Sequence, residues 1–470
     1  MSSEETALSY LNKNEDVLSN LAKDIWDHPE LSLQETYASK LLIEQLEKAG
    51  FSVTKGLNQL PTGFIGSWGE GKPIIGILGE YDALPMLSQK VSTKPEPIEE
   101  GGPGHGCGHN LLGVGALGAA ISAKKAMEKN GIKGIIRYYG CPAEELGAGK
   151  AYMARDKVFH DLDAAITWHS MYLNTVWTAP TYAYNSFKLN FYGVSTHESA
   201  NPETSRSALD ALLITEMAIN LLHRHVIHDS YTHRNITKAG LPPQPDCGCS
   251  YAQIWYVLRA PNRDEMDKIY AKILELAKYA TLMTGTTFDV EFVFGIHDYM
   301  VNNVLREVAI EKLKQIGAPK YTEEEITFAK TLQKTVAPEA LESFVETYGN
   351  GLRHEDMGEP LCDRIADRVV TKMQPVSTDV GSTSHVIPTV QLNTCCMPFG
   401  CGLHTWQSTA SYGSSIGFKG MMLAAKAMAL TALDLMVNPD HVQAAREEFV
   451  KATGGREYVS PLPEGSVPTA

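Results

Sequence analysis

The sequence lacks the features that mark several large protein classes. Its 470 residues include only eight cysteines and no Cys-x-x-Cys pair, so a disulfide scaffold, a zinc ribbon and thioredoxin-type redox chemistry have no support. No apolar stretch reaches the ~18 residues that a membrane span requires. The sequence also has no internal repeats and no low-complexity tracts. We expect most of the cysteines to be buried free thiols.

Basic charge is also scarce. There are 41 Lys and Arg residues against 55 Asp and Glu residues, a formal net charge of −14, and no basic stripe that could bind phosphate. We therefore expect no nucleic-acid partner. The first residues are polar and acidic and lack the basic-then-apolar profile of a signal peptide, so we expect a cytoplasmic protein with no membrane partner.

The sequence contains enough apolar residues to build a large core. Hydrophobic residues make up 43% of the chain and charged residues 20%, which is ordinary for globular proteins. At ~150 residues per domain the length corresponds to about three units. One large domain with a smaller inserted domain fits the same length.

Near-continuous apolar runs predict a buried parallel sheet. Residues 73–79, 134–140 and 163–168 form such runs, and helical spacing is found over residues 18–50 and 111–127. Strands that are buried on both faces and alternate with helices are typical of α/β proteins. We therefore predict an α/β domain with a mostly parallel sheet, whose last core helix covers residues 420–437.

The middle of the chain has a different pattern. Strands that alternate apolar and polar residues are separated by two helices, in the order β-α-β-β-α-β that defines a ferredoxin-like unit. The predicted strands lie near residues 187–192, 233–238, 251–259 and 288–294, and the helices near 205–228 and 262–285. We predict an inserted α+β domain at residues 183–297, within a larger domain formed by residues 1–182 and 298–470.

Polar side chains follow the predicted strands of the larger domain. Ligands of open parallel sheets gather at the carboxyl ends of the strands, so these side chains are expected to face one crevice. Imidazole, thiolate and carboxylate groups are those that bind a divalent metal. The side chains concerned are Asp82, Cys107, His109, Glu144, Glu145 and His169.

The adjacent pair Glu144-Glu145 permits two interpretations. Successive side chains usually point apart, so one carboxylate could bind metal while the other acts as a general base. The pair could equally be two solvated glutamates at the start of a helix, stabilised by the helix dipole. The local sequence does not decide between them.

Seven motifs together resemble the aminobenzoyl-glutamate utilization branch of peptidase family M20, in the metallo-aminoacylase and carboxypeptidase superfamily. The resemblance covers nearly the whole chain. It implies a metallo-aminopeptidase-like catalytic domain with an inserted domain that acts in closing the site and in dimerisation. The motifs are GEYDALP from Gly79, GHGCGHN from Gly104, YGCPAEE from Tyr139, AITWH from Ala165, RSALD from Arg206, STDVG from Ser377 and LHTWQ from Leu403.

The resemblance also implies roles for individual residues. Glu144 matches the general base, and His197 matches a histidine that in relatives reaches a neighbouring subunit's site and supports the oxyanion. Residues matching positions near the metal or substrate are Asp82, Asn110, Arg206 and Asp379. The matches to the metal ligands are Cys107, His109, Glu145, His169 and His404.

The implied activity is metal-dependent hydrolysis of the amide bond of an N-acyl or aryl amino acid, or of a dipeptide. One or two divalent ions, Mn or Zn, are expected per subunit, in a homodimer or in a heterodimer with a sibling subunit. Glu203 and Asp246 are acidic where the family pattern has neutral or cationic residues, which disfavours p-aminobenzoyl-glutamate itself as the substrate.

Two other functions remain open at this stage. The chain could be a non-catalytic partner subunit of such a hydrolase, or an aminohydrolase that releases ammonia from an aromatic amine at the same site. A nucleotide-binding function is disfavoured, because the G-x-G-x-x-G run from Gly113 to Gly118 does not follow a strand. Close helix packing explains these glycines better. The run Gly147-Ala-Gly-Lys150 likewise lacks the spacing of a phosphate loop.

Overall fold

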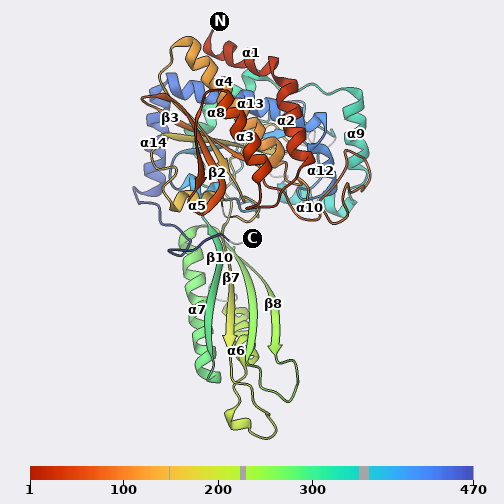
Figure 1. Ribbon diagram of the computed structural model, residues 1–470, viewed down its shortest axis with the longest axis vertical. Helices are drawn as coiled ribbons and strands as arrows, with labels where there is room; N and C mark the ends of the chain where they lie inside the picture. The colour runs from red at the N-terminus through yellow and green to blue at the C-terminus, as the bar shows by residue number, and fades with distance from the viewer. Residues whose placement is uncertain (148, 223–228, 349–358, 469–470) are drawn as a thin grey trace.

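The computed structural model describes the whole chain except residues 148, 223–228, 349–358 and 469–470, and Figure 1 shows its arrangement. The described residues form two sheets. The larger sheet has the strand order β1-β2-β4-β3-β5-β11-β6, and the smaller has the order β10-β7-β9-β8. In Figure 1 the smaller sheet extends downward from the layered larger part.

The centre of the larger sheet is parallel, as the apolar runs predict. Strands β3, β4, β5 and β11 run parallel to one another, whereas β1, β2 and β6 are antiparallel to their neighbours. The predicted runs correspond to β3, β4 and β5. The strands are β1 Ser52–Leu57, β2 Leu60–Glu70, β3 Ile74–Glu80, β4 Gly134–Cys141, β5 Ala164–Met171, β6 Thr175–Val176 and β11 Thr389–Cys395.

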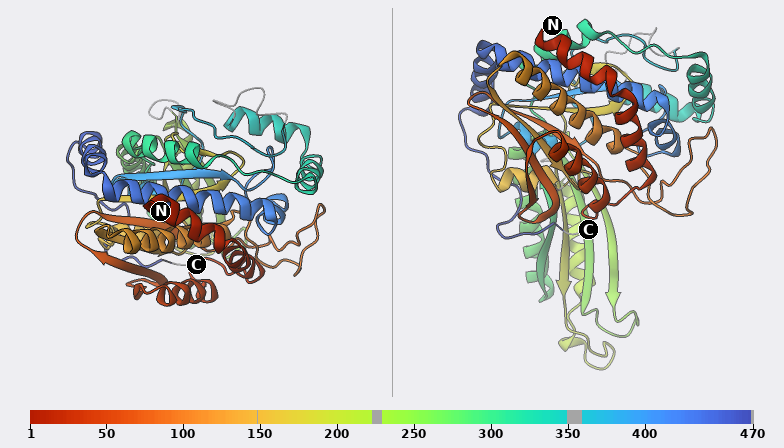
Figure 2. Two further views of the ribbon diagram at one scale, coloured as in Figure 1. Left: turned by 90° about the horizontal axis from the view of Figure 1, so that it is seen from above. Right: turned by 45° about the horizontal axis from the view of Figure 1, so that its top comes forward.

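Helices pack on both sides of this sheet, as the view from above shows (Figure 2). In sequence order they are α1 Ser3–Lys13, α2 Glu15–Asp27, α3 Thr36–Lys48, α4 His109–Asn130, α5 Gly149–Arg155, α8 Asn303–Ile316, α9 Glu323–Gln333, α10 Pro338–Tyr348, α11 Val380–Ser384, α12 Trp406–Tyr412, α13 Ser415–Val437 and α14 Pro439–Thr453. The region predicted as helical from residue 18 to residue 50 is two helices, α2 and α3.

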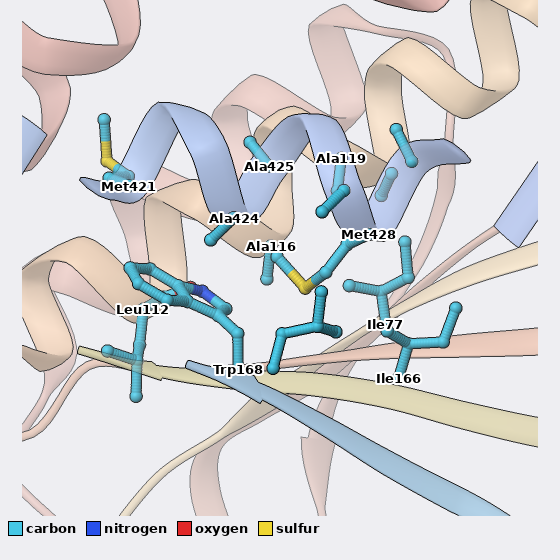
Figure 3. Close-up of a cluster of buried hydrophobic side chains, with 14 of the residues drawn as sticks. Ile77, Leu112, Ala116, Ala119, Ile166, Trp168, Met421, Ala424, Ala425 and Met428 are labelled. Carbon is cyan, nitrogen blue, oxygen red and sulfur yellow. The ribbon is translucent and has the colours of Figure 1, made fainter. Parts of the chain in front are cut away.

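Helices α4 and α13 lie side by side over the centre of the sheet (Figure 3). Small residues such as Ala116 and Ala424 let the two helices approach, and Met428 fills the space above Ile77 and Ile166. This is the centre of the hydrophobic core.

Helix α13 corrects one expectation from the sequence. Over the described residues it is the one helix whose length and composition would allow it to cross a membrane, with 23 residues that include an 18-residue stretch of mean hydropathy 1.5. Lys426 and Asp434 interrupt the apolar run, so no part of the helix is apolar over the whole length that a membrane span requires. Because 83% of its apolar window is buried inside the protein, we interpret α13 as a core helix.

The glycines of the G-x-G-x-x-G run serve helix packing. A Cβ atom on Gly113 would lie 2.8 Å from the carbonyl oxygen of Glu80, and one on Gly115 would lie 2.9 Å from the ring of Trp168. Helix α4 therefore packs directly on strands β3 and β5. The close approach also brings the beginning of α4, with His109, to the carboxyl edge of the sheet.

The smaller sheet is the predicted ferredoxin-like unit. Its four strands are antiparallel, and α6 and α7 pack against it in the order β-α-β-β-α-β. The elements are β7 Ala183–Tyr192, α6 Ala208–Leu222, β8 Tyr231–Leu241, β9 Tyr251–Ala260, α7 Arg263–Thr284 and β10 Thr287–Ile296, with a short 3-10 helix at Pro202–Thr204. The end of the predicted helix at residues 223–228 lies outside the described residues.

Local signals explain the ends of α7. The Asn262 side chain accepts a hydrogen bond from the backbone N–H of Glu265 at 2.9 Å, which caps the first turn. Gly285 ends the helix with φ of +67°, a conformation that glycine adopts without strain. Below, we call the unit from β7 to β10 the lid.

Candidate metal and catalytic site

The predicted metal-ligating residues converge at the carboxyl ends of β3, β4 and β5. The possible ligand atoms of Cys107, His109 and His169 lie within 4.8 Å of one another, and those of Cys107, Glu145 and His404 do so as well. The thiol of Cys107 therefore belongs to both groups. These side chains come from four separate segments of the chain.

A tight glycine loop places Cys107 and His109. Gly108 has φ of +80° and precedes α4, and a Cβ atom there would lie 2.4 Å from the hydroxyl oxygen of Ser170. That hydroxyl donates to the carbonyl oxygen of Cys107 at 2.7 Å. The loop is thus attached to the end of β5, and a side chain at position 108 would push it away.

Hydrogen bonds orient both imidazole rings toward the site. His109 is fully buried, and its Nδ1 lies 2.9 Å from Oδ1 of Asp82. His169 places Nδ1 2.9 Å from the carbonyl oxygen of Ser170. Since each Nδ1 faces an acceptor, each Nε2 is directed toward the site, as in the carboxylate–histidine–metal arrangement.

Several of the inward atoms have no hydrogen-bond partner within the described part of the chain. These buried atoms are Nε2 of His109, Oε1 of Glu145 and Oε2 of Glu80. Buried polar atoms without partners are costly, and both an imidazole nitrogen and a carboxylate oxygen can bind a metal ion. The donor set of imidazole, thiol and carboxylate groups therefore fits a divalent metal.

The two carboxylates after β4 both border the cluster, with Oε2 of Glu144 and Oε1 of Glu145 each 3.9 Å from Nε2 of His109. Ala143, just before them, has φ of +57°, and its N–H is held by Oε1 of the buried Glu35 at 2.9 Å. Glu144 accepts a hydrogen bond from the hydroxyl of Thr378 at 2.9 Å. The backbone N–H of Glu145 donates to Oδ2 of Asp82 at 2.9 Å. This geometry favours the functional interpretation of the pair over two solvated glutamates.

His404 completes the group from the far end of the sequence. Its Nε2 lies 3.4 Å from Oε2 of Glu145, and its backbone N–H donates to the carbonyl oxygen of Gly106 at 3.0 Å. The residue has φ of +59°, which is strained for a histidine and is common at functional sites. The contact with Gly106 fixes the histidine beside the glycine loop.

Burial dominates the protonation of this cluster. Desolvation raises the pKa of Glu145 to about 7 and lowers the pKa of His169 and of His404 to about 4. Burial would raise the pKa of Asp82 as well, but the charge and hydrogen bond of His109 outweigh it, so that pKa falls to about 2. His169 and His404 are thus neutral at pH 7, the form that binds metal.

A buried ion network lies behind the cluster. The ammonium of Lys150 contacts Oε1 of Glu80 at 2.6 Å and the carboxylate of Asp379, and all three side chains are buried. Oε2 of Glu80 lies 3.4 Å from Nε2 of His109. Glu80 is therefore the residue of this network that lies next to the metal-ligating side chains. Asp379, which was predicted to lie near the metal or substrate, contacts Lys150 instead.

Glu80 and Lys150 were not among the residues predicted for the site. Glu80 is two residues before Asp82, so alternation along an extended segment was an available signal. Lys150 carried no such signal, because its partner Asp379 is 229 residues away in the sequence.

Two predicted residues make structural contacts away from the cluster. The side-chain amide of Asn110 donates to the carbonyl oxygens of Ala22 and Tyr412, and so links α4 to α2 and α12. The guanidinium of Arg206 donates to the carbonyl oxygens of Glu203 and Ser205 in its own loop. We therefore assign Asn110 and Arg206 structural contacts within this chain.

His197 also lies apart from the cluster. Its side chain is 59% exposed, and its Nε2 lies 3.9 Å from Oδ2 of Asp246. It belongs to the loop between β7 and α6, which lies at the end of the lid furthest from the larger sheet (Figure 1). Within one chain, His197 is therefore not part of the cluster around Cys107.

A cavity of about 280 Å³ opens beside the metal-ligating side chains. Glu144, Glu145 and His404 line one side, and residues at the base of the lid line the other. The lid contributes three apolar or aromatic side chains and one arginine: Tyr184, Phe294, Ile296 and Arg259. The cavity therefore lies between the larger domain and the lid.

Arg259 was not predicted either. It occupies an ordinary position in a strand of alternating apolar and polar residues, so nothing in the local sequence distinguishes it. Its guanidinium lies 4.9 Å from the ring centroid of Tyr184, and its Nε is buried without a hydrogen-bond partner in the described structure. A buried donor beside a cavity is suited to an anionic group of a ligand.

Comparison with known proteins agrees with this geometry. Residues 76–356 match the family model described as peptidase family M20/M25/M40. The chain belongs to this family. It is therefore a metal-dependent hydrolase of C–N bonds, of the peptidase or amidohydrolase type.

Relatives of this M20 hydrolase cover almost the whole chain. A p-aminobenzoyl-glutamate hydrolase chain of Escherichia coli (strain K12), named as one of that enzyme's subunits, is 37% identical over 462 residues, which is 96% of this chain and 95% of the relative. The Xaa-Arg dipeptidase of Homo sapiens is 26% identical over 468 residues, 94% of this chain and 91% of the relative.

Solved structures show the same fold. A dinuclear metal-binding M20 peptidase from Bacillus subtilis matches with a TM-score of 0.59 at 16% identity, over 91% of this chain and 99% of the other. An aminobenzoyl-glutamate utilization protein from Klebsiella pneumoniae matches with a TM-score of 0.59 at 12% identity, over 91% and 97%.

Proposed function

We propose that this M20 hydrolase cleaves the amide bond of N-acyl or N-aroyl amino acids, or of dipeptides, that carry a free carboxylate. The observation that supports this most directly is the set of convergent donor atoms around Cys107, beside two carboxylates that face one cavity. The residues that would hold the metal are Cys107, His109, Glu145, His169 and His404.

The metal would be one or two divalent ions per subunit, zinc or manganese. Such an ion acts as a Lewis acid, which polarises the amide carbonyl and makes water a nucleophile near neutral pH. A thiol ligand favours zinc over manganese, because sulfur is a soft donor. Cys107 is buried and its Sγ lies 3.4 Å from Nε2 of His169, so the thiol is held among the other ligands.

Glu144 is the proposed general base. Its carboxylate lines the cavity, and the Thr378 hydroxyl holds Oε1, which leaves Oε2 toward the site, 3.9 Å from Nε2 of His109. In this role Oε2 accepts a proton from the attacking water and then delivers it to the nitrogen of the leaving amine. Water adds to the carbonyl carbon, the C–N bond breaks, and the proton balance closes on Glu144.

Arg259 supports the choice of substrate class. An arginine beside an aromatic wall suits a substrate that carries a carboxylate next to an apolar or aromatic group. The apolar wall includes Trp177, Phe294 and Leu403. A carboxylate at Arg259 would orient the substrate across the cavity, with its amide toward Glu144.

His197 supports a functional assembly of two chains. It is exposed on the lid and lies outside the cavity, so a neighbouring chain is the partner whose oxyanion it could stabilise. The Escherichia coli relative is named as one subunit of a hydrolase, which points to a sibling chain as the alternative to a homodimer. A purely non-catalytic partner role is disfavoured, because the base and the metal-ligating residues are all present.

Metal analysis together with product identification would test the proposal. The purified protein, loaded with Zn²⁺ or Mn²⁺, would be screened by mass spectrometry with N-acyl amino acids, aryl amides and dipeptides. We expect release of the amino acid from substrates with a free carboxylate and little cleavage when that carboxylate is capped as an amide. Release of ammonia from an aromatic amine would indicate the aminohydrolase instead, and inactivity of the metal-loaded chain alone would indicate that a sibling chain is required.

Variants would then test the individual roles. Cys107→Ala should lower metal affinity by at least ~10-fold, because a direct ligand is lost, whereas full metal occupancy would exclude the thiol as a ligand. Arg259→Met should raise KM for carboxylate-bearing substrates by ~10- to 100-fold, with Arg259→Lys intermediate. An equal effect on capped and free substrates would exclude Arg259 as the carboxylate anchor.

A further inference from the structure

A second group of possible metal ligands lies where the chain leaves the lid. The ligand atoms of His297, Asp298 and His385 lie within 4.8 Å of one another. His297 and Asp298 directly follow β10, and His385 directly follows α11. These residues are distinct from those that line the cavity beside Glu144.

Nδ1 of His297 has the protonation state and the burial that are expected of a metal ligand. His297 is 6% exposed, and its Nε2 lies 2.9 Å from the carbonyl oxygen of Val459. A carbonyl oxygen only accepts, so Nε2 carries the proton and Nδ1 carries a lone pair. That Nδ1 is buried and has no hydrogen-bond partner within the described residues. An outer-shell carbonyl that fixes the tautomer is typical of metal-ligating histidines.

The other two side chains complete the group. Nε2 of His385 is buried and lies 3.4 Å from Oδ2 of Asp298, without a hydrogen bond to it in the described structure. The second oxygen of Asp298, Oδ1, accepts the backbone N–H of Arg263 at 3.0 Å, which fixes the carboxylate. The side chains of His385 and Asp298 are 22% and 17% exposed, so solvent can reach the group from one side.

We propose that His297, Asp298 and His385 form a second metal site for a divalent transition ion of the zinc class. Two imidazoles and one carboxylate with an open fourth position are a ligand set that zinc accepts. Nδ1 of His297, Nε2 of His385 and Oδ2 of Asp298 would be the ligand atoms. This inference does not depend on the proposed hydrolytic activity.

A metal ion here would link the lid to the larger domain. Gly381, in α11, approaches the backbone at the end of the lid so closely that a Cβ atom would lie 2.1 Å from the carbonyl oxygen of His297. Helix α11 begins beside Asp379, which contacts Lys150 in the buried ion network. The ion would therefore fasten the chain leaving β10 to the helix next to that network, and its main effect would be on stability.

The alternative is an ordinary ion pair between His385 and Asp298. The chain offers a matched control, because His441 and Asp434 form a histidine–aspartate pair with 2.6 Å between Nδ1 and Oδ1 and appear in none of the possible metal-ligating groups found among the described residues. Loss of His441 removes such a pair and a histidine, but no proposed ligand.

Metal titration of the full-length protein would test the site. The metal-free protein would be dialysed against Zn²⁺, and bound metal would be measured for the wild type, His385→Ala, Asp298→Asn and His441→Ala. We expect the first two variants to bind about one ion fewer per chain than the wild type, and His441→Ala to bind the same number. Added Zn²⁺ should also raise Tm less in His385→Ala than in His441→Ala.

Cobalt distinguishes this site from the one around Cys107. Co²⁺ bound to a thiolate shows sulfur-to-metal charge-transfer absorption, and His385→Ala should keep that absorption while losing about one equivalent of Co²⁺. Equal stoichiometry in the wild type, His385→Ala and Asp298→Asn would overturn the proposal. An equal loss in His441→Ala would also overturn it, by showing non-specific binding to surface histidines.

Discussion

The two regions that carry the predicted functional residues are built in opposite ways. Around Cys107, at the edge of the larger sheet, most side chains are buried and they are fixed by contacts within the same chain. On the distal loop of the lid, the side chain of His197 is 59% exposed, and its Nε2 lies 3.9 Å from Oδ2 of Asp246. The metal-ligating side chains of the first region come from one polypeptide, whereas His197 lies outside the cavity that they border.

This difference shows where each kind of chemistry is expected. Metal binding requires preorganised, desolvated ligands, and the larger domain supplies them through a network of outer hydrogen bonds. A group that acts on a neighbouring chain must instead remain accessible until the chains associate. The predictions below follow this contrast, from the largest expected effect to the smallest.

Glu144→Gln should abolish most of the activity while leaving the buried region intact. The amide keeps the shape of the side chain and can still accept from Thr378, but it cannot take a proton from water, so the rate should fall by ~10²- to 10⁴-fold. Steady-state kinetics and metal analysis of the same sample would test this. A variant that loses its metal together with its activity would place Glu144 among the ligands, and one that keeps its activity would remove it as the base.

Lys150→Met should destabilise the protein by about 3–5 kcal/mol, because it leaves the carboxylates of Glu80 and Asp379 buried without their cation. The free energy of unfolding would be measured by denaturant titration of the metal-free protein. Lys188→Met is a matched control, because Lys188 pairs with Glu291 at the surface and its loss should cost less than about 1 kcal/mol. A similar loss of unfolding free energy in both variants would contradict the claim that Lys150 compensates two buried carboxylates.

His197→Ala should lower kcat by about 10²-fold, because an oxyanion donor is lost, without changing metal content. Mixing it with Glu144→Gln provides a sharper test. In a mixed dimer, the site with an intact Glu144 receives His197 from the other chain, so random reassembly should restore about a quarter of the wild-type activity. No recovery in verified mixed dimers would show that His197 does not act across the dimer.

Arg206→Ala should have the smallest effect. Its guanidinium donates to two carbonyl oxygens of its own exposed loop, so its loss should cost less than about 1 kcal/mol in unfolding free energy. The same variant would be assayed for hydrolysis. A fall in kcat/KM of more than about 10-fold, with stability unchanged, would show that Arg206 acts at a neighbouring chain's site like His197.

The sequence predicted those parts of the fold whose burial is continuous. Strands β3, β4 and β5 are apolar on both faces, and the lid alternates regularly, so both sheets were anticipated. Strand β1 was not, because most of its residues are exposed at the edge of the sheet. Helix α1 was also overlooked, although Ser2 and Glu5 form a capping box at its start.

Long-range pairing explains what was missed at the site. The motifs identified the residues around Cys107, but Lys150 and Asp379 are brought together only by the fold. Arg259 occupies an ordinary position in an alternating strand, and only its unpartnered Nε beside the cavity distinguishes it among the described residues. Such signals exist in three dimensions and leave no local pattern.

The pairing of β7 with β10 means that the lid could be removed from the protein as one segment. Tyr184 lies opposite Ile296 in the ladder, so the chain enters and leaves the lid at neighbouring points. A short linker joining those points would excise the whole insertion without stretching the remaining polypeptide. The shortened protein would retain Cys107 and Glu144 but lose Arg259 and Phe294, and would thus separate metal binding from substrate selection.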